Sequence, residues 1–377
     1  MSRTTRLAVA SGAAGALGAL AVAAARTGRG VSEEMGATPS GARLTRMQGS
    51  PQWAGERFRN ADASVAGGPE GDAVTQRDAI RRLITGRALR QPPVTIPTSR
   101  TGAILPTEGV WMSWLGHASA LVSLGGSLIL LDPVWSDRCS PSQFVGPQRL
   151  HPTPFALGDL PTISAVVISH DHYDHLDMAT IKELVALQDC PFVVPLGIGA
   201  HLERWGVPAR RIVELDWTES YAVDEVTLTA VAAQHFSGRG LRRDGTLWAS
   251  WVLESSAGKV YFSGDTGYFS GFSEIGSAHG PFDVALMAVG MYDPAWRSIH
   301  LDPEEAVTAA QELGARLAVP IHWCTFVLAP HPWSEPVERF LEAASGASVE
   351  VAVPTVGQPV DVSAPPQLTP WWRAPGR

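Results

Sequence analysis

The most informative segment of this chain reads Ile168-Ser169-His170-Asp171-His172-Tyr173-Asp174-His175-Leu176-Asp177. It follows an apolar run, residues 163 to 168, which predicts a buried β-strand. A loop at the end of such a strand presents its polar side chains together at one edge of a sheet. The spacing His-x-His-x-Asp-His supplies imidazoles and a carboxylate, which suit zinc, iron or manganese. Because one tetrahedral ion would not use all four groups, the loop favours two neighbouring metal ions.

Short β-forming runs alternate with helical patterns from Gly109 onward, and this alternation is typical of a layered α/β domain. The clearest strand candidates are residues 111 to 115, 128 to 131 and 284 to 289. Asp302-Pro303-Glu304-Glu305 predicts the start of a helix, because it combines an N-cap residue, an early proline and acids in the first turn. A second helix is expected from Glu335 to Ala344.

The histidine-rich motif after a strand resembles the signature of the metallo-β-lactamase superfamily of hydrolases. This resemblance implies an α/β fold, a four-layer αββα sandwich. Within the superfamily, the likeness is greatest to the branch that contains N-acyl-phosphatidylethanolamine phospholipase D. The segments that carry it, between about Ala103 and Gly357 with a fainter echo at Arg57 to Asn60, are Trp114 to Ser119, Asp132 to Ser136, Val145 to Arg149, Gln234 to Arg239 and His300 to Ala306.

The resemblance also implies a ligand set. Three later ligands arrive in the order that the family shows, each after an expected strand: His235 after residues 226 to 233, Asp265 after residues 260 to 262, and His322 after residues 317 to 321. One ion would be bound by His170, His172 and His235, the second by Asp174, His175 and His322, with Asp265 as the bridge. The expected cofactor is two zinc ions, with iron or manganese as alternatives. A hydroxide between two cations would be the nucleophile, because they lower the pKa of bound water toward neutrality.

Other residues are expected to support these ligands. Asp132 either orients a histidine ligand or caps the turn before Pro133. His117 is expected to have a structural, hydrogen-bonded role. His151 and His331, which are flanked by prolines, are expected in solvated turns.

The expected catalytic groups are Asp174, Asp265 and His300. His300 precedes the Asp302 helix and is expected to contact the substrate or a developing oxyanion. Arg149 or Arg239 is expected to neutralise the anionic group of the substrate.

The leading functional hypothesis is hydrolysis of a phosphodiester, such as that of an N-acyl-phosphatidylethanolamine-like phospholipid. Hydrolysis of a lactone, ester or amide is the principal alternative, and a non-catalytic, membrane-tethered metal-binding protein and a diiron oxidase are further ones. Many β-lactamases of this fold lack an aspartate at the bridging position, so Asp265 argues against antibiotic hydrolysis.

The charge balance argues against a nucleic-acid partner. Lysine and arginine number 29 against 37 acidic residues, which gives a formal charge of −8, whereas phosphate binding relies on clustered basic residues. The expected partner is a small-molecule or lipid substrate. The cysteines Cys139, Cys190 and Cys324 are expected to be buried free thiols.

The sequence suggests four regions. Residues 1–30 contain an uncharged Ala- and Gly-rich run that follows Arg3 and Arg6. This pattern predicts a signal peptide or membrane anchor, and a disordered leader is the alternative. Export or membrane association is therefore expected, and a cytoplasmic location is the alternative. Residues 31–102 are expected to form a linker and surface extension with a helical pattern at Val74 to Leu89, residues 103–360 the catalytic domain, and residues 361–377 a tail.

Overall fold

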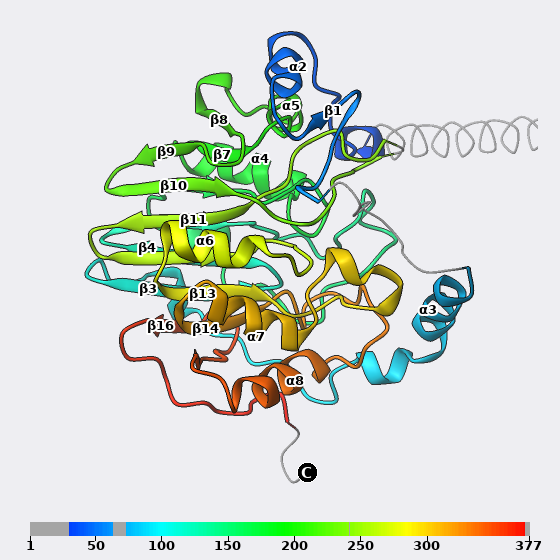
Figure 1. Cartoon of the computed structure of the whole chain (residues 1–377), viewed down its shortest axis with the longest axis vertical. Helices are drawn as coiled ribbons and strands as arrows, with labels where there is room; N and C mark the ends of the chain where they lie inside the picture. Colours follow the sequence, from blue (N-terminus) through cyan, green and yellow to red (C-terminus); the bar gives the residue numbers. More distant parts are fainter. Residues whose placement is uncertain (1–29, 63–72, 241, 374–377) are drawn as a thin grey trace, which may run out of the picture.

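Two β-sheets packed face to face form the centre of the molecule (Figure 1). The computed structural model describes residues 30–62, 73–240 and 242–373. Each sheet has seven strands, and helices cover the outer faces, so the expected αββα sandwich is confirmed. Within the described residues, no helix has the length and apolar character needed to cross a bilayer. The predicted leader lies outside the described residues, apart from Gly30.

The first sheet combines an antiparallel half with a parallel half. Its strands, in spatial order, are β16 (Pro359–Asp361), β3 (Val110–Gly116), β4 (Ser119–Leu124), β5 (Ser127–Leu131), β6 (Ala165–Val167), β7 (Phe192–Pro195) and β8 (Ile212–Leu215). Strands β5 to β8 run parallel, and β16 to β5 pair antiparallel. The parallel strands therefore end at one edge, where polar loops can meet.

The second sheet has the same mixed character. Its strands, in spatial order, are β15 (Glu350–Val351), β14 (Ala315–Ile321), β13 (Phe282–Ala288), β12 (Gly258–Phe262), β11 (Ser250–Ser255), β10 (Val226–Val231) and β9 (Ser220–Val223). Strands β12 to β15 run parallel, and β9 to β12 pair antiparallel. All the strands expected from the sequence fall within these two sheets.

Helices close both outer faces of the sandwich. They are α4 (Met178–Leu187) and α5 (Gly199–Arg204) on the first sheet, and α6 (Gly271–His279), α7 (Pro303–Glu312) and α8 (Glu335–Ala344) on the second. Short 3-10 turns lie at η1 (Arg87–Arg90), η2 (Thr101–Ala103), η3 (Leu157–Asp159), η4 (Ala209–Arg211) and η5 (Pro294–Ile299). Helix α7 begins where its sequence predicted, because Asp302 and Glu305 form a reciprocal capping box.

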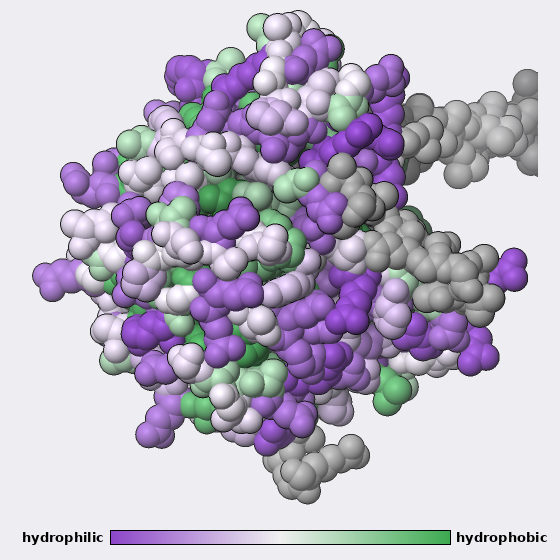
Figure 2. Space-filling view, viewed as in Figure 1, coloured by the Kyte–Doolittle hydropathy of each residue, from purple (hydrophilic) through white to green (hydrophobic). Residues whose placement is uncertain are grey.

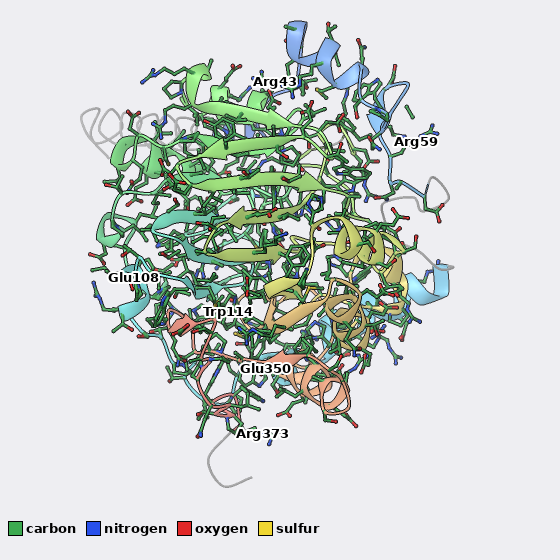
Figure 3. The ribbon with its side chains drawn as sticks, turned by 60° about the vertical axis from the view of Figure 1, so that its left-hand side comes forward. Arg43, Arg59, Glu108, Trp114, Glu350 and Arg373 are labelled. Carbon is green, nitrogen blue, oxygen red and sulfur yellow. The ribbon has the colours of Figure 1, made fainter. Side chains whose placement is uncertain are left out.

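Apolar side chains fill the space between the sheets. Trp114 of β3 is fully buried and stacks on Trp323, with 5.6 Å between ring centroids. In Figure 3, Trp114 lies in the middle of the molecule, whereas the labelled charged residues Arg59 and Glu108 lie at its edges. The face seen in Figure 2 is mostly hydrophilic, with hydrophobic residues in small patches. The three cysteines are buried and unpaired, as expected.

The segment before the sandwich packs against it. It contains α2 (Gly41–Gln48), the hairpin β1 (Trp53–Ala54) and β2 (Arg57–Phe58), and α3 (Ala73–Thr85). Arg43 of α2 forms a 2.6 Å ion pair with Glu214, and Phe58 is buried in the main core. This extension, shown in blue in Figure 1, therefore adds both charge pairs and apolar contacts to the domain.

The residues after 360 do not form the separate tail that the sequence suggested. Strand β16 reaches Asp361 and pairs with β3. Trp371 stacks on Trp323 at 5.4 Å, and Trp372 is buried with its indole N–H donating to Glu338. Because burying large aromatic rings stabilises the fold strongly, residues up to 373 belong to the domain.

Candidate metal centre

The predicted ligands meet at one edge of the sandwich. The loop after β6 carries His170, His172, Asp174 and His175, and loops after three strands of the second sheet carry His235, Asp265 and His322. Their ligand atoms form overlapping groups whose members lie within 4.8 Å of one another. These groups are His170, His172 and His235; His170, His175 and Asp265; His117, Asp174, His175 and His322; and His235, Asp265 and His300.

The distances separate two subsites. In the first, His172 Nδ1 lies 2.8 Å from His170 Nε2 and 3.3 Å from His235 Nε2. In the second, the Nε2 atoms of His175 and His322 lie 3.1 Å apart. These contacts are compatible with the two sets that the family resemblance implies, although His170 also lies in a group with His175 and Asp265.

Asp265 lies between the two subsites. Its carboxylate is 3.0 Å from His322 Nε2 and 3.3 Å from His175 Nε2, on the second subsite. It is also 3.8 Å from His235 Nε2 and 4.0 Å from His170 Nε2, on the first. A carboxylate that reaches both groups has the placement of a bridging ligand.

The donor set fits metal cations. Burial holds the pKa of His170 and of His235 well below its ordinary value, so both rings are neutral. Burial alone would raise the pKa of Asp265, but His175 and His322 beside it hold that pKa well below its ordinary value. Neutral imidazoles and ionised carboxylates are the forms that bind metals.

Two further features point to a cation. Asp265 Oδ1 is buried, and among the described residues it makes no hydrogen bond of good geometry, although His322 Nε2 approaches it to 3.0 Å. For His175, the carboxylates of Asp265 and Asp174 outweigh burial and raise the pKa well above its ordinary value. A metal ion would supply the positive charge that a proton on His175 otherwise provides.

Asp132 supports the second subsite from the end of β5. Its Oδ2 accepts a 2.7 Å hydrogen bond from His175 Nδ1, and its Oδ1 accepts one of 2.6 Å from the main-chain N–H of Ser169. Its carboxylate is fully buried. The structure therefore places Asp132 in hydrogen-bond contact with the predicted ligand His175, which favours the orienting role over that of a turn cap.

His117 lies behind the second subsite. Its Nε2 is 2.9 Å from Asp174 Oδ2, and its main-chain N–H donates to Thr325 Oγ1 at 2.6 Å. Thr325 Oγ1 is also 3.0 Å from His151 Nε2. His151 is thus buried, and the expectation that it lies in a solvated turn is wrong, because its proline-flanked loop packs on the turn after β14.

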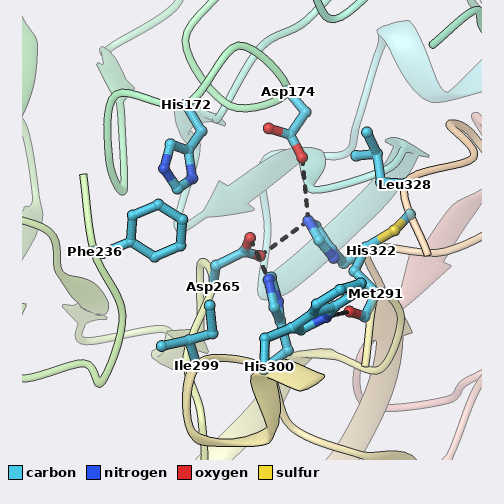
Figure 4. Close-up of a pocket in the computed structure, with 10 residues that line it drawn as sticks. His172, Asp174, Phe236, Asp265, Met291, Ile299, His300, His322 and Leu328 are labelled. Carbon is cyan, nitrogen blue, oxygen red and sulfur yellow. Dashed lines mark hydrogen bonds and ion pairs between the residues drawn. The ribbon is translucent and has the colours of Figure 1, made fainter. Parts of the chain in front are cut away.

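A cavity of about 200 Å³ opens beside the ligands (Figure 4). Its lining mixes polar groups of both subsites with apolar side chains. The polar lining residues are His172, Asp174, Asp265, His300 and His322, and the apolar ones are Phe236, Met291, Trp296, Ile299 and Leu328. The sequence did not single out Phe236, Met291, Ile299 or Leu328 as site residues, because they lie on separate loops. Among these four, only Phe236 directly follows a predicted metal ligand.

His300 reaches the cavity from the loop before α7. Its Nδ1 is 3.8 Å from Asp265 Oδ2, and Figure 4 shows it beneath that carboxylate. Burial lowers the pKa of His300 to about 4, so the ring is neutral near pH 7. It can therefore donate or accept a hydrogen bond at the cavity wall.

Neither of the predicted substrate-binding arginines lines this cavity. Arg149 donates to the carbonyls of Val134 and Ser136 and lies over the Phe326 ring. Arg239 is buried beneath the ligand loop. Its guanidinium donates to main-chain carbonyls of Asp171 at 2.9 Å, Leu176 at 2.6 Å and Glu34 at 2.9 Å. These contacts hold both guanidinium groups away from the cavity and favour a structural role for them.

Two face-to-face mixed sheets with clustered histidine and aspartate ligands at one edge define a metal-binding hydrolase fold. The chain belongs to the metallo-β-lactamase superfamily, since the family described as "Beta-lactamase superfamily domain" matches residues 128–323. It lies in the branch that resembles N-acyl-phosphatidylethanolamine phospholipase D. The protein is accordingly a metal-dependent hydrolase of this superfamily.

Individual proteins and one solved structure are similar to this chain over much of its length. An uncharacterized protein of Mycobacterium tuberculosis is 48% identical, over 91% of this chain and 93% of its own length. N-acyl-phosphatidylethanolamine-hydrolyzing phospholipase D 1 of Caenorhabditis elegans is 39% identical over 58% of this chain and 65% of its own length. Among solved structures, Igni18, a metallo hydrolase of Ignicoccus hospitalis, has a TM-score of 0.53 at 23% identity. The match covers 67% of this chain and 97% of Igni18, and it shows the fold alone.

Proposed function

We propose that this protein is a phosphodiesterase that uses two zinc ions to hydrolyse an N-acyl-phosphatidylethanolamine-like phospholipid. One observation carries the proposal: residues of both metal subsites and several apolar side chains line the same cavity. A substrate that fits has a polar reacting group attached to an apolar chain. The similarity to the Caenorhabditis elegans phospholipase D supports a phosphodiester as that reacting group.

The side chains around the cavity have distinct tasks. Bound cations would lower the pKa of water and stabilise negative charge on the phosphoryl oxygens. Asp174 and Asp265 present carboxylate oxygens at the cavity wall, where they can accept a hydrogen bond from the attacking water. His300 is placed to donate a hydrogen bond to the oxyanion that develops as the phosphodiester is cleaved. Phe236 and Leu328 line the same cavity on different sides and limit the access of water.

The cavity size favours a second candidate. Its volume of about 200 Å³ is below the roughly 300–1,000 Å³ typical of ligand sites, so a small ester, lactone or amide also fits. The same groups would then polarise a carbonyl instead of a phosphoryl oxygen.

The test compares the wild-type full chain with four variants. Metal content is measured by elemental analysis, and hydrolysis is measured with bis-p-nitrophenyl phosphate, vesicles containing N-palmitoyl-phosphatidylethanolamine, and p-nitrophenyl acetate. We expect about two metal ions per wild-type chain. His172→Ala and Asp265→Ala should lose metal and activity together, because each removes a ligand. His279→Ala, which changes a histidine outside the cluster, serves as the control.

His300→Ala separates substrate contact from metal binding. We expect it to keep its metal while kcat falls by about 10²–10³, the usual effect of losing one oxyanion contact. Metal loss in this variant would make His300 a ligand instead. Two metals per chain with ester but no phosphodiester hydrolysis would replace the leading proposal with the second candidate.

A further inference from the structure

The N-terminal extension reaches the metal centre through one buried side chain. Asn60 lies two residues beyond β2 and is 5% exposed. The hairpin before it is fixed to the domain, because Phe58 is buried in the main core and its main-chain N–H donates to Asp244 at 2.9 Å. Trp53 packs edge-on against Phe58 with 5.0 Å between ring centroids. The side chain of Asn60 is thus presented from a firmly held element.

The side-chain amide of Asn60 forms hydrogen bonds with both the main-chain carbonyl and the main-chain N–H of the predicted metal ligand His235. Its Nδ2 donates to the His235 carbonyl at 3.0 Å, and its Oδ1 accepts from the His235 N–H at 3.0 Å. The indole N–H of Trp248 also donates to Oδ1 at 3.0 Å. An amide side chain suits this place because it offers a donor and an acceptor side by side.

The main chain at His235 needs these hydrogen bonds because strand β10 ends before this residue. That strand stops at Val231, so the main chain at His235 has left the sheet, and no strand among the described residues pairs with it. Buried main-chain N–H and C=O groups require partners, and here Asn60 supplies both. The His235 ring is held separately, since its Nδ1 lies 2.9 Å from the Ile299 carbonyl. Together these contacts direct Nε2 toward the cluster.

We propose that Asn60 is a positioning residue for the metal ligand His235, which makes the N-terminal extension a structural part of the metal centre. This inference rests on the proposed metal centre but not on the substrate. Loss of Asn60 would free the His235 main chain and weaken the subsite formed by His170, His172 and His235. The second subsite has its own support from Asp132 and should retain its ion.

The test measures metal binding in the full chain. Asn60→Asp keeps the size and one acceptor but sets a carboxylate oxygen against the His235 carbonyl, and Asn60→Ala removes both bonds. Phe58→Leu is the matched control, because it loosens the same hairpin without touching His235. Zinc affinity is measured by competition with a chromophoric chelator. The visible spectrum of the cobalt-loaded protein reports the ligand geometry, and thermal melts of the metal-free proteins report the fold.

We expect both Asn60 variants to bind one of two ions about 10- to 100-fold more weakly, with an altered cobalt spectrum. Phe58→Leu should keep the wild-type zinc affinity even if its melting temperature falls as much as that of the Asn60 variants. Wild-type affinity and spectrum in the Asn60 variants would overturn the inference, as would an equal loss in Phe58→Leu. Failure of both Asn60 variants to fold would also overturn it, since the role would then be general. If wild type binds two ions but cleaves no phosphodiester, the proposed function fails and this inference stands.

Discussion

Individual side chains in this protein have roles that depend on a few hydrogen bonds. Asp132 illustrates this, because its buried carboxylate accepts from both His175 Nδ1 and the main chain of Ser169. Burial alone raises the pKa of Asp132, and these donors oppose that effect. The carboxylate therefore fixes the ring of His175 and the start of the ligand loop at the same time.

Replacing Asp132 by asparagine tests this role. Asparagine has nearly the same size, but its amide N–H groups would face donors. We expect the zinc affinity of Asp132→Asn to fall by about 10- to 100-fold, measured by chelator competition. Asp137→Asn, at an exposed position of the following loop, should bind zinc as wild type does. Unchanged affinity in Asp132→Asn would rule out an orienting role.

At the scale of elements, helix α7 begins next to the cavity, and neighbouring residues in the sequence fix where it begins. Its N-cap Asp302 accepts from the Glu305 N–H at 2.9 Å, and Glu305 in turn accepts from the Asp302 N–H at 3.1 Å. The cap lies two residues after His300. Leu301, between them, donates to the Thr266 carbonyl at 2.8 Å, next to the bridging Asp265. The start of α7 therefore holds the His300 loop in place.

Removing the cap should cost stability in a predictable amount. Asp302→Ala leaves the first-turn N–H groups of α7 without their acceptor, which costs about 1 kcal/mol. The melting temperature should then fall by about 1–2 °C in a thermal melt, because the unfolding entropy grows with the length of the chain. Thr308→Ala, at an exposed position within the same helix, should cause a smaller change. An equal effect of both substitutions would contradict a specific capping role.

At the scale of the whole molecule, the sandwich concentrates charge at one edge. Loops from both sheets bring the buried carboxylates of Asp132 and Asp265, and the nearly buried one of Asp174, into one cluster. Burying ionised groups is costly unless they are paired or coordinate metals. The bound metal should therefore stabilise the fold as well as the reaction.

Metal removal tests this coupling. A ligand present at 100 times its dissociation constant stabilises the native state by about 2.7 kcal/mol. We therefore expect dialysis against a chelator to lower the melting temperature, and added zinc to restore it. Asp265→Ala should show a smaller difference between the two conditions, because its site is incomplete. Identical melts with and without metal would show that the cluster is stable by itself.

The sequence alone determined the features that depend on neighbouring residues. The strand followed by the His170 to His175 loop, the capped start of α7 at Asp302 and the alternating strands can each be recognised within a short window, because hydrogen-bonding and burial patterns repeat locally. The family resemblance added the order of the later ligands. The fold class and the candidate ligand set could thus be predicted before any coordinates.

Only the tertiary structure decided which distant groups meet. Asn60 and His235 are 175 residues apart, and no local pattern marks one as the partner of the other. Arg239 resembled a substrate contact by sequence, yet packing buries it beneath the ligand loop. Trp372, expected in a tail, is buried in the core. The reason is physical: a side chain's partners and burial follow from how the sheets and loops pack, and each position in the sequence is compatible with many such environments.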